Sequence, residues 1–260
     1  MAIVTLLAAG GTALVLRNHS SNRAAALAAR HAQVDRTVNS LLAGIPQEGL
    51  DLGKRTAPFT VEIFLDLEDP TCRWWFREKL PVVISRFVRT GVLRLQYHAF
   101  KRNTYSPAVF VNQQTAALAA GAQNELWNFT GIFLYEQGGE FAHYANEAFL
   151  NDIARQIPGL SLSQWHTDRH TGRREEQTVS EDQAARALGL HVTPAFRIAK
   201  ASKPMSILTG QYMVQYPEQH HPIALIEASD IASAIKRLDH KEPPSPTKRV
   251  IPEILSYRLE

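Results

Sequence analysis

The chain has 260 residues, of which 45% are apolar, and this is enough for one sizeable hydrophobic core, so the composition excludes a disordered chain. Its formal net charge is only +3, and no basic run carries interleaved aromatic side chains, so nucleic acid is not an expected partner. A single cysteine excludes an intramolecular disulfide and any zinc site of the C-x-x-C type.

Residues 1–16, MAIVTLLAAGGTALVL, carry no charge and are mostly apolar. As a helix they would span about 24 Å, which is shorter than the roughly 30 Å of a membrane hydrocarbon core. The alternatives are a signal-peptide core and a merely apolar N-terminus, but no basic residue precedes the segment and no small-residue cleavage site follows promptly. We interpret residues 1–16 as an uncleaved membrane anchor.

The Ala-rich stretch that follows has apolar residues at near-helical spacing: Leu27, Val34, Val38 and Leu41. The rest of the stretch is polar, so residues 17–44 are predicted to form a helical stalk. Residues 44–58 are dense in glycine and proline, which is typical of a linker. We expect the globular domain to occupy residues 45–240.

The stretch 59–76, FTVEIFLDLEDPTCRWWF, is predicted to form a strand, a turn and a helix. Alternate apolar residues would place one face of the strand in the core: Phe59, Val61, Ile63 and Leu65. Asp69 is predicted to cap the helix with its carboxylate, and Pro70 suits the first helical position because that position needs no N–H donor. Cys72 begins the apolar face of this helix.

The same helix is predicted to reach residue 89 with a kink at Pro81, and residues 92–100 alternate as a second strand. Two strands joined by a helix form a βαβ unit, for which a right-handed parallel crossover is the default. Residues 105–188 are then predicted to be a helical insertion, and its last helix is expected to begin at Val179. The remaining expectations are a strand at 191–199, a hairpin partner at 206–211, a helix at 224–238 and a Pro-rich tail at 241–260.

This order of elements resembles the DsbA-like branch of the thioredoxin fold. Residues 45–61 resemble the entry to membrane-anchored bacterial DsbA-family proteins, and 119–129 a part of their helical insertion. The string FLDLE at 64–68 resembles the strand end before the family's C-P-x-C active site, and VTPAF at 192–196 its cis-proline loop. The resemblance covers about residues 45–238 and implies an α/β thioredoxin fold with a DsbA-like helical insertion.

In register with that family, Pro70 takes the position of the proline of C-P-x-C. Asp69 then replaces the attacking cysteine, and Cys72 corresponds to the buried resolving cysteine. Thiol–disulfide exchange needs an exposed thiolate to attack and a second thiol to resolve, so the resemblance implies a protein without its own dithiol cycle. Two interpretations remain for each residue. Asp69 is either a helix cap or a catalytic or ligand-binding residue, and Cys72 is either a buried apolar residue or a reactive thiol.

The resemblance also implies that Pro194 is a cis-proline and that Thr193 before it presents its backbone to a substrate. An equal alternative is that this loop only closes the sheet edge beside Asp69. Trp74 is a candidate for lining a groove that takes peptide. Three carboxylates close in sequence lack a histidine in register or a convergent loop, and they are interpreted as a polar strand end and not as a metal site: Asp66, Glu68 and Asp69. No Gly-rich phosphate loop occurs, and no cofactor is expected.

The leading hypothesis is a membrane-anchored, DsbA-like protein of the thiol–disulfide oxidoreductase family with a degenerate active site. Any residual redox chemistry would be monothiol, through Cys72 and a thiol-bearing partner. The first alternative is a non-enzymatic module that holds an extended peptide or a partner protein in the cis-proline groove, and the second is an enzyme that uses Asp69 for other chemistry. The domain is expected to be extracytoplasmic, although the arginines that follow residues 1–16 favour the opposite orientation by the positive-inside rule.

Overall fold

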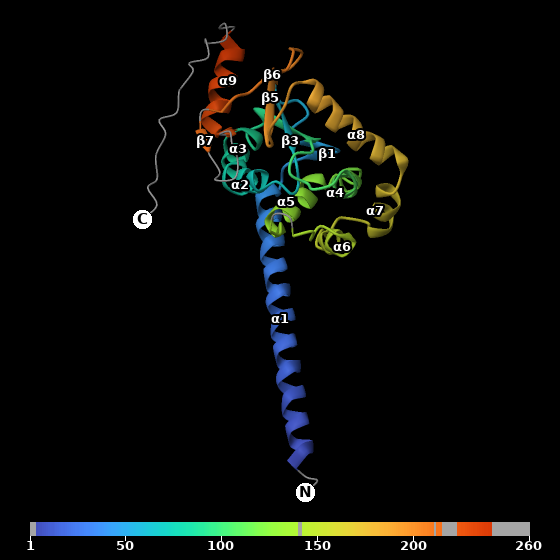
Figure 1. The fold of residues 1–260 in the computed structure, drawn as a ribbon. Helices are drawn as coiled ribbons and strands as arrows, with labels where there is room; N and C mark the ends of the chain where they lie inside the picture. The colour runs from blue at the N-terminus through green and yellow to red at the C-terminus, as the bar shows by residue number, and fades with distance from the viewer. Residues whose placement is uncertain (1–3, 140–141, 211, 215–222, 241–260) are drawn as a thin grey trace, which may run out of the picture.

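A computed structural model describes residues 4–139, 142–210, 212–214 and 223–240, in which helices surround a six-stranded mixed sheet (Figure 1). The strands follow the order β1-β2-β4-β3-β5-β6, with β3 and β4 parallel and the other neighbours antiparallel. Two further strands, β7 and β8, form an antiparallel pair. The strands are β1 (Gln47–Glu48), β2 (Asp51–Leu52), β3 (Phe59–Leu65), β4 (Leu93–Ala99), β5 (Ala195–Lys200), β6 (Ser206–Ile207), β7 (Tyr212–Val214) and β8 (Ile223–Leu225).

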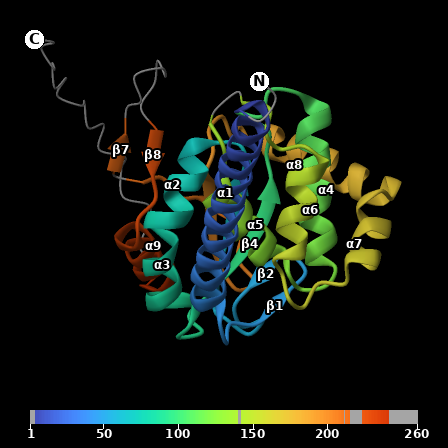
Figure 2. The same ribbon diagram turned by 90° about the horizontal axis from the view of Figure 1, so that it is seen from below.

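The helices cover both faces of the sheet and form a cluster beside it (Figures 1 and 2). They are α1 (Val4–Leu42), α2 (Pro70–Glu78), α3 (Leu80–Val83), a π-helical turn (Ile84–Val88), α4 (Pro107–Gly121), α5 (Leu126–Glu136), α6 (Glu147–Arg155), α7 (Leu162–Arg169), α8 (Gly172–Ala187) and α9 (Ala228–His240).

The predicted βαβ unit is confirmed by β3, α2 and β4. The two strands pair in parallel from Phe59 opposite Leu93 to Leu65 opposite Ala99. The helix predicted to run to residue 89 is divided, because α2 ends at Glu78 and a short α3 and a π-helical turn follow. Pro81 lies in the first turn of α3, where its missing N–H interrupts the helical hydrogen bonds.

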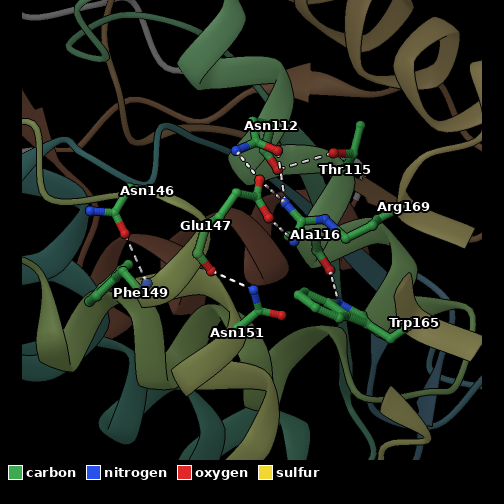
Figure 3. A network of polar contacts seen from close by, with 9 residues as sticks. All are labelled: Asn112, Thr115, Ala116, Asn146, Glu147, Phe149, Asn151, Trp165 and Arg169. Carbon is green, nitrogen blue, oxygen red and sulfur yellow. Dashed lines mark hydrogen bonds and ion pairs between the residues drawn. The ribbon is translucent and has the colours of Figure 1, made fainter. Parts of the chain in front are cut away.

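The predicted helical insertion is formed by α4 to α8, and a buried arginine ties three of its helices together (Figure 3). The side chain of Arg169 on α7 is fully buried and donates from Nη1 and Nη2 to the carboxylate of Glu147 on α6, both at 3.1 Å. Its Nη2 also donates to Oδ1 of Asn112 on α4 at 2.7 Å. The guanidinium lies 4.6 Å from the ring centre of Trp165, whose Nε1 donates to the carbonyl of Ala116.

The first helix projects from the domain, yet its last three turns belong to the core (Figures 1 and 2). Residues 22–30 are exposed, whereas Val34, Val38 and Leu42 are buried against the domain. Gly131 on α5 permits this close packing, since a Cβ there would lie 2.8 Å from Cγ1 of Val38. The division of stalk from domain at residue 44 stays a prediction, although the stalk contributes to the core.

Arg89 fixes the end of α1 by donating to the carbonyl oxygens of Ser40, Leu41 and Ala43. These carbonyls belong to the last turn and the residue after it, where the helix itself supplies no donors. Among the helices of the described residues, none is both long enough and apolar enough to cross a membrane. The anchor at residues 1–16 therefore stays a prediction.

Several boundaries differ from the sequence-based ones. The last insertion helix was expected near residue 179 but begins at Gly172, because its first turns are polar and show no apolar period. The strand expected from residue 191 begins at Ala195, after the loop with Pro194, and the hairpin partner covers only Ser206–Ile207. The helix expected from residue 224 begins at Ala228. The tail at 241–260 lies outside the described residues.

Candidate functional site

The N-terminus of α2 is built around Asp69, as the sequence predicts. The strand β3 ends at Leu65, and Asp69 has extended backbone angles, with φ −77° and ψ 118°. Its Oδ1 accepts the backbone N–H of Thr71 at 2.8 Å, and Pro70 is the first helical residue. The carboxylate thus satisfies a helix N–H that has no partner within the helix.

The same carboxylate joins the helix to the loop before β5. The hydroxyl of Thr193 donates to Oδ2 of Asp69 at 2.5 Å, and Sγ of Cys72 donates to the same oxygen at 3.5 Å. The peptide bond between Thr193 and Pro194 is cis. Asp69 and Thr193 are each 2% exposed and Cys72 is fully buried. The structure therefore brings together four residues that the sequence analysis selected: Asp69, Cys72, Thr193 and Pro194. We call this buried group the closed site.

Burial controls the acid–base properties of this group. Removal from water raises the pKa of Asp69 to about 6, and the charge of Asp66 raises it as well, against hydrogen bonds from Thr193, Thr71 and Cys72 that lower it. Burial also raises the pKa of the Cys72 thiol well above its usual range, and the charge of Asp69 adds to this. Cys72 consequently stays protonated near neutral pH, whereas thiol–disulfide exchange requires a thiolate.

Asp66 acts as a clamp between β3 and the loop after β4. Its Oδ2 accepts the backbone N–H groups of Arg102, Asn103 and Thr104 at 2.7, 2.7 and 2.9 Å. Its Oδ1 accepts the N–H of Glu68 at 3.1 Å and the hydroxyl of Thr104. The carboxylate is therefore fully engaged by the fold, and the described part of the chain holds no group of three metal-ligating side chains.

The two tryptophans of α2 have different surroundings. Trp75 is buried, donates from Nε1 to the carbonyl of Ile226 at 2.8 Å, and packs on Phe196 with 4.9 Å between ring centres. Trp74 is half-buried, and Nζ of Lys79 lies 4.9 Å from the centre of its ring. The peptide-binding role predicted for Trp74 stays a prediction.

The comparisons with known proteins agree with this geometry. The family model described as thioredoxin matches residues 47–204. The chain belongs to the thioredoxin family. A search of curated proteins found no match.

Solved structures show which branch of the thioredoxin fold this is. Oxidised BdbD from Bacillus subtilis is 14% identical, with a TM-score of 0.56 over 74% of this chain and 96% of that chain. DsbA from Chlamydia trachomatis is 16% identical, with a TM-score of 0.56 over 74% and 92%. A thioredoxin-like oxidoreductase from Silicibacter pomeroyi is 22% identical, with a TM-score of 0.53 over 79% and 98%. The predicted DsbA-like thioredoxin fold is confirmed.

Two features of this thioredoxin site were not foreseen from the sequence. The clamp made by Asp66 was seen only as a polar strand end, because its partners lie more than thirty residues later. The bond between Asp69 and Thr193 spans 124 residues. The resemblance placed both residues at the active site of the family, and it gave no sign that their side chains bond to each other.

Proposed function

We propose that this thioredoxin-family protein runs no dithiol redox cycle and serves as a protein-binding module. The observation that carries the proposal is the carboxylate of Asp69, which lies buried at the start of α2 and bonds to both Thr71 and Thr193. In register with the DsbA family, this is the position of the attacking cysteine. A carboxyl group there can accept a helix N–H, but it cannot form a disulfide.

Monothiol chemistry through Cys72 has little support from the geometry. The thiol has no exposed surface, and its pKa is raised by burial and by the charge of Asp69. An attacking thiol must be both accessible and ionised. Cys72 therefore fits a buried apolar residue that packs under the helix, and a partner thiol would not reach it without local unfolding.

Binding is supported by the surface beside the closed site. Val192 precedes Thr193 and is 40% exposed, and Leu188 at the end of α8 is 38% exposed. The DsbA resemblance implies that an extended peptide would lie along this loop. The protein would then retain a peptide-binding surface like that implied by the resemblance, without thiol–disulfide exchange.

The redox half of the proposal is tested with the full chain in insulin-reduction and substrate-oxidation assays. Wild type and Cys72→Ser are expected to give equal traces at the background level. Asp69→Cys places two cysteines three residues apart and is expected to form an intramolecular disulfide and gain activity. Asp152→Cys, which adds a second cysteine at an exposed site on α6, is the matched control and should gain none. Wild-type activity that disappears in Cys72→Ser would establish monothiol chemistry instead.

Membrane anchoring through residues 1–16, with an extracytoplasmic domain, is part of the same proposal. It is supported only by the uncharged apolar composition of that segment. The full chain is expected to fractionate with membranes, and a chain that begins at residue 22 is expected to remain in the soluble fraction. That truncation keeps Val34, Val38 and Leu42 in the core, which a start at residue 45 would remove.

A further inference from the structure

The side chains of Arg102 and Arg186 lie near the ring of Phe100, the residue that follows β4. The guanidinium carbons of Arg102 and Arg186 lie 5.8 and 5.6 Å from the centre of its ring. Nη2 of Arg186 donates to the carbonyl of Lys101 at 3.1 Å, although the two residues are 85 positions apart. We call Lys101, Arg102 and Arg186 the Phe100 rim.

The carboxylates near the rim are already engaged. Asp182 accepts from Nε and Nη2 of Arg186 at 2.9 and 3.1 Å, and also from the backbone N–H of Lys101 at 2.8 Å. Glu181 accepts the backbone N–H of Ala99 at 2.8 Å. Within the described residues, the ammonium of Lys101 and the guanidinium of Arg102 have no carboxylate partner. The rim therefore presents two cations that the fold leaves uncompensated.

The rim borders the loop that carries Thr193. Phe100, Leu190 and Ala195 belong to one small hydrophobic cluster, which connects the residue after β4 with both ends of the cis-proline loop. The backbone of Arg102 is also tied to the active-site strand through Asp66. The exposed apolar side chains of Leu188 and Val192 belong to the same loop and the helix end before it. The two arginines over Phe100 and the exposed side chains of Leu188 and Val192 thus belong to segments that meet in this one hydrophobic cluster.

We propose that the Phe100 rim, together with Leu188 and Val192, binds a protein segment that carries carboxylates beside apolar side chains. This inference rests on the proposed binding function and names the chemistry of its partner. Apolar side chains of the segment would cover Leu188 and Val192, while its carboxylates pair with Lys101 and Arg102. Charge pairs at the rim of an interface set specificity and association rate, and they weaken as salt rises.

The test measures binding of three short labelled peptides to the full chain by fluorescence anisotropy. Their sequences alternate leucine with glutamate, glutamine or lysine. The glutamate peptide is expected to bind at least about tenfold more tightly than the other two, which corresponds to about 1.4 kcal/mol, and its affinity should fall as salt is added. A single-stranded oligonucleotide serves as a further probe. Equal or tighter binding of the oligonucleotide would overturn the proposal in favour of a general polyanion site.

The double variant Lys101→Glu/Arg102→Glu is expected to lose at least about tenfold in affinity for the glutamate peptide. The matched control is Arg173→Glu/Lys203→Glu, which reverses two exposed charges away from the rim and should bind as wild type does. If the first double variant fails to fold, Arg102→Gln replaces it, with a smaller loss expected in the same direction. Wild type that binds no peptide, or equal affinities in both double variants, would overturn the proposal.

Failure of this inference and failure of the proposed function are distinguishable. The peptide measurements involve no thiol, and the redox assays on wild type and Asp69→Cys involve no rim residue. A protein that lacks redox activity and binds the glutamine peptide as well as the glutamate peptide would keep the binding function and refute the acidic partner.

Discussion

The carboxylate of Asp69 accepts a hydrogen bond from the hydroxyl of Thr193, 124 residues later in the chain. This bond joins the start of α2 to the loop before β5, at the position that the resemblance to the DsbA family assigns to an attacking cysteine. Both residues are almost fully buried, so water cannot replace either partner when one is removed. The stability of the site and its response to pH are therefore coupled to this one contact.

Thr193→Val is expected to lower the free energy of unfolding by about 2 kcal/mol, because it removes a hydrogen bond to a buried carboxylate without changing the shape of the side chain. The pKa of Asp69 should rise further in this variant, since the bond from Thr193 lowers it. Urea denaturation at pH 7 gives the free energy. Thr130→Val is the matched control: Thr130 is buried, but its hydroxyl has no partner in the described structure. Equal losses in the two variants would contradict the importance of the bond.

The raised pKa of Asp69 predicts an unusual pH dependence. An acid with a higher pKa in the folded chain binds its proton more tightly when folded, so its contribution to stability falls as pH rises from 3.8 to about 6. The full change is about 3 kcal/mol for a shift of this size. It appears in the stability difference between wild type and Asp69→Asn, measured by urea denaturation from pH 4 to 7. A difference that does not change between pH 4 and 7 would refute the shift.

The end of α1 is expected to stabilise the domain. Val38→Ala should lower the free energy of unfolding by about 2 kcal/mol, because Val38 is fully buried and its removal leaves a cavity. Leu27→Ala on the same helix should change it by less than about 0.5 kcal/mol, since Leu27 is 52% exposed. Denaturant titrations of both variants make the comparison. A loss confined to Leu27→Ala would mean that the helix packs differently.

The ion pair of Arg169 is expected to matter more than surface pairs. Glu147→Gln leaves a fully buried guanidinium without its carboxylate, and a loss of about 2 kcal/mol is expected, less than for a completely dry pair because Glu147 is 55% exposed. Asp152→Asn breaks the exposed pair with Arg155 and should cost less than about 0.5 kcal/mol. Thermal or urea unfolding distinguishes the two. Similar small losses would show that water compensates Arg169.

The local structure of the site was predictable from the sequence, because it depends on neighbouring residues. The alternation of β3, the cap at Asp69 and the proline after it are all short-range signals, and each was confirmed. The start of α8 at Gly172 was missed because a polar, exposed helix carries no apolar period. The length of α8 depends on its backbone hydrogen bonds, which the sequence pattern does not show.

Contacts between distant segments were not predictable in the same way. Asp66 was interpreted as part of a polar strand end, but its carboxylate holds the loop of residues 102–104. Only the folded chain brings those N–H groups to it. Likewise, the spacing of apolar residues in the stalk predicted a helix. It did not predict that Val34 and Val38 are buried in the core of the domain. The DsbA resemblance supplied the arrangement of the fold, and the side-chain partners followed from the structure.

Gly131, which allows α5 to pack closely against α1, also determines the direction of α1. From Val38 to its first described residue α1 extends about 50 Å, at 1.5 Å per residue. A side chain at Gly131 would push against Val38, and a tilt of about 5° at that contact would swing the far end by about 4 Å over this length. The direction of the 39-residue helix α1 is therefore set by its packing contact with Gly131, inside the domain.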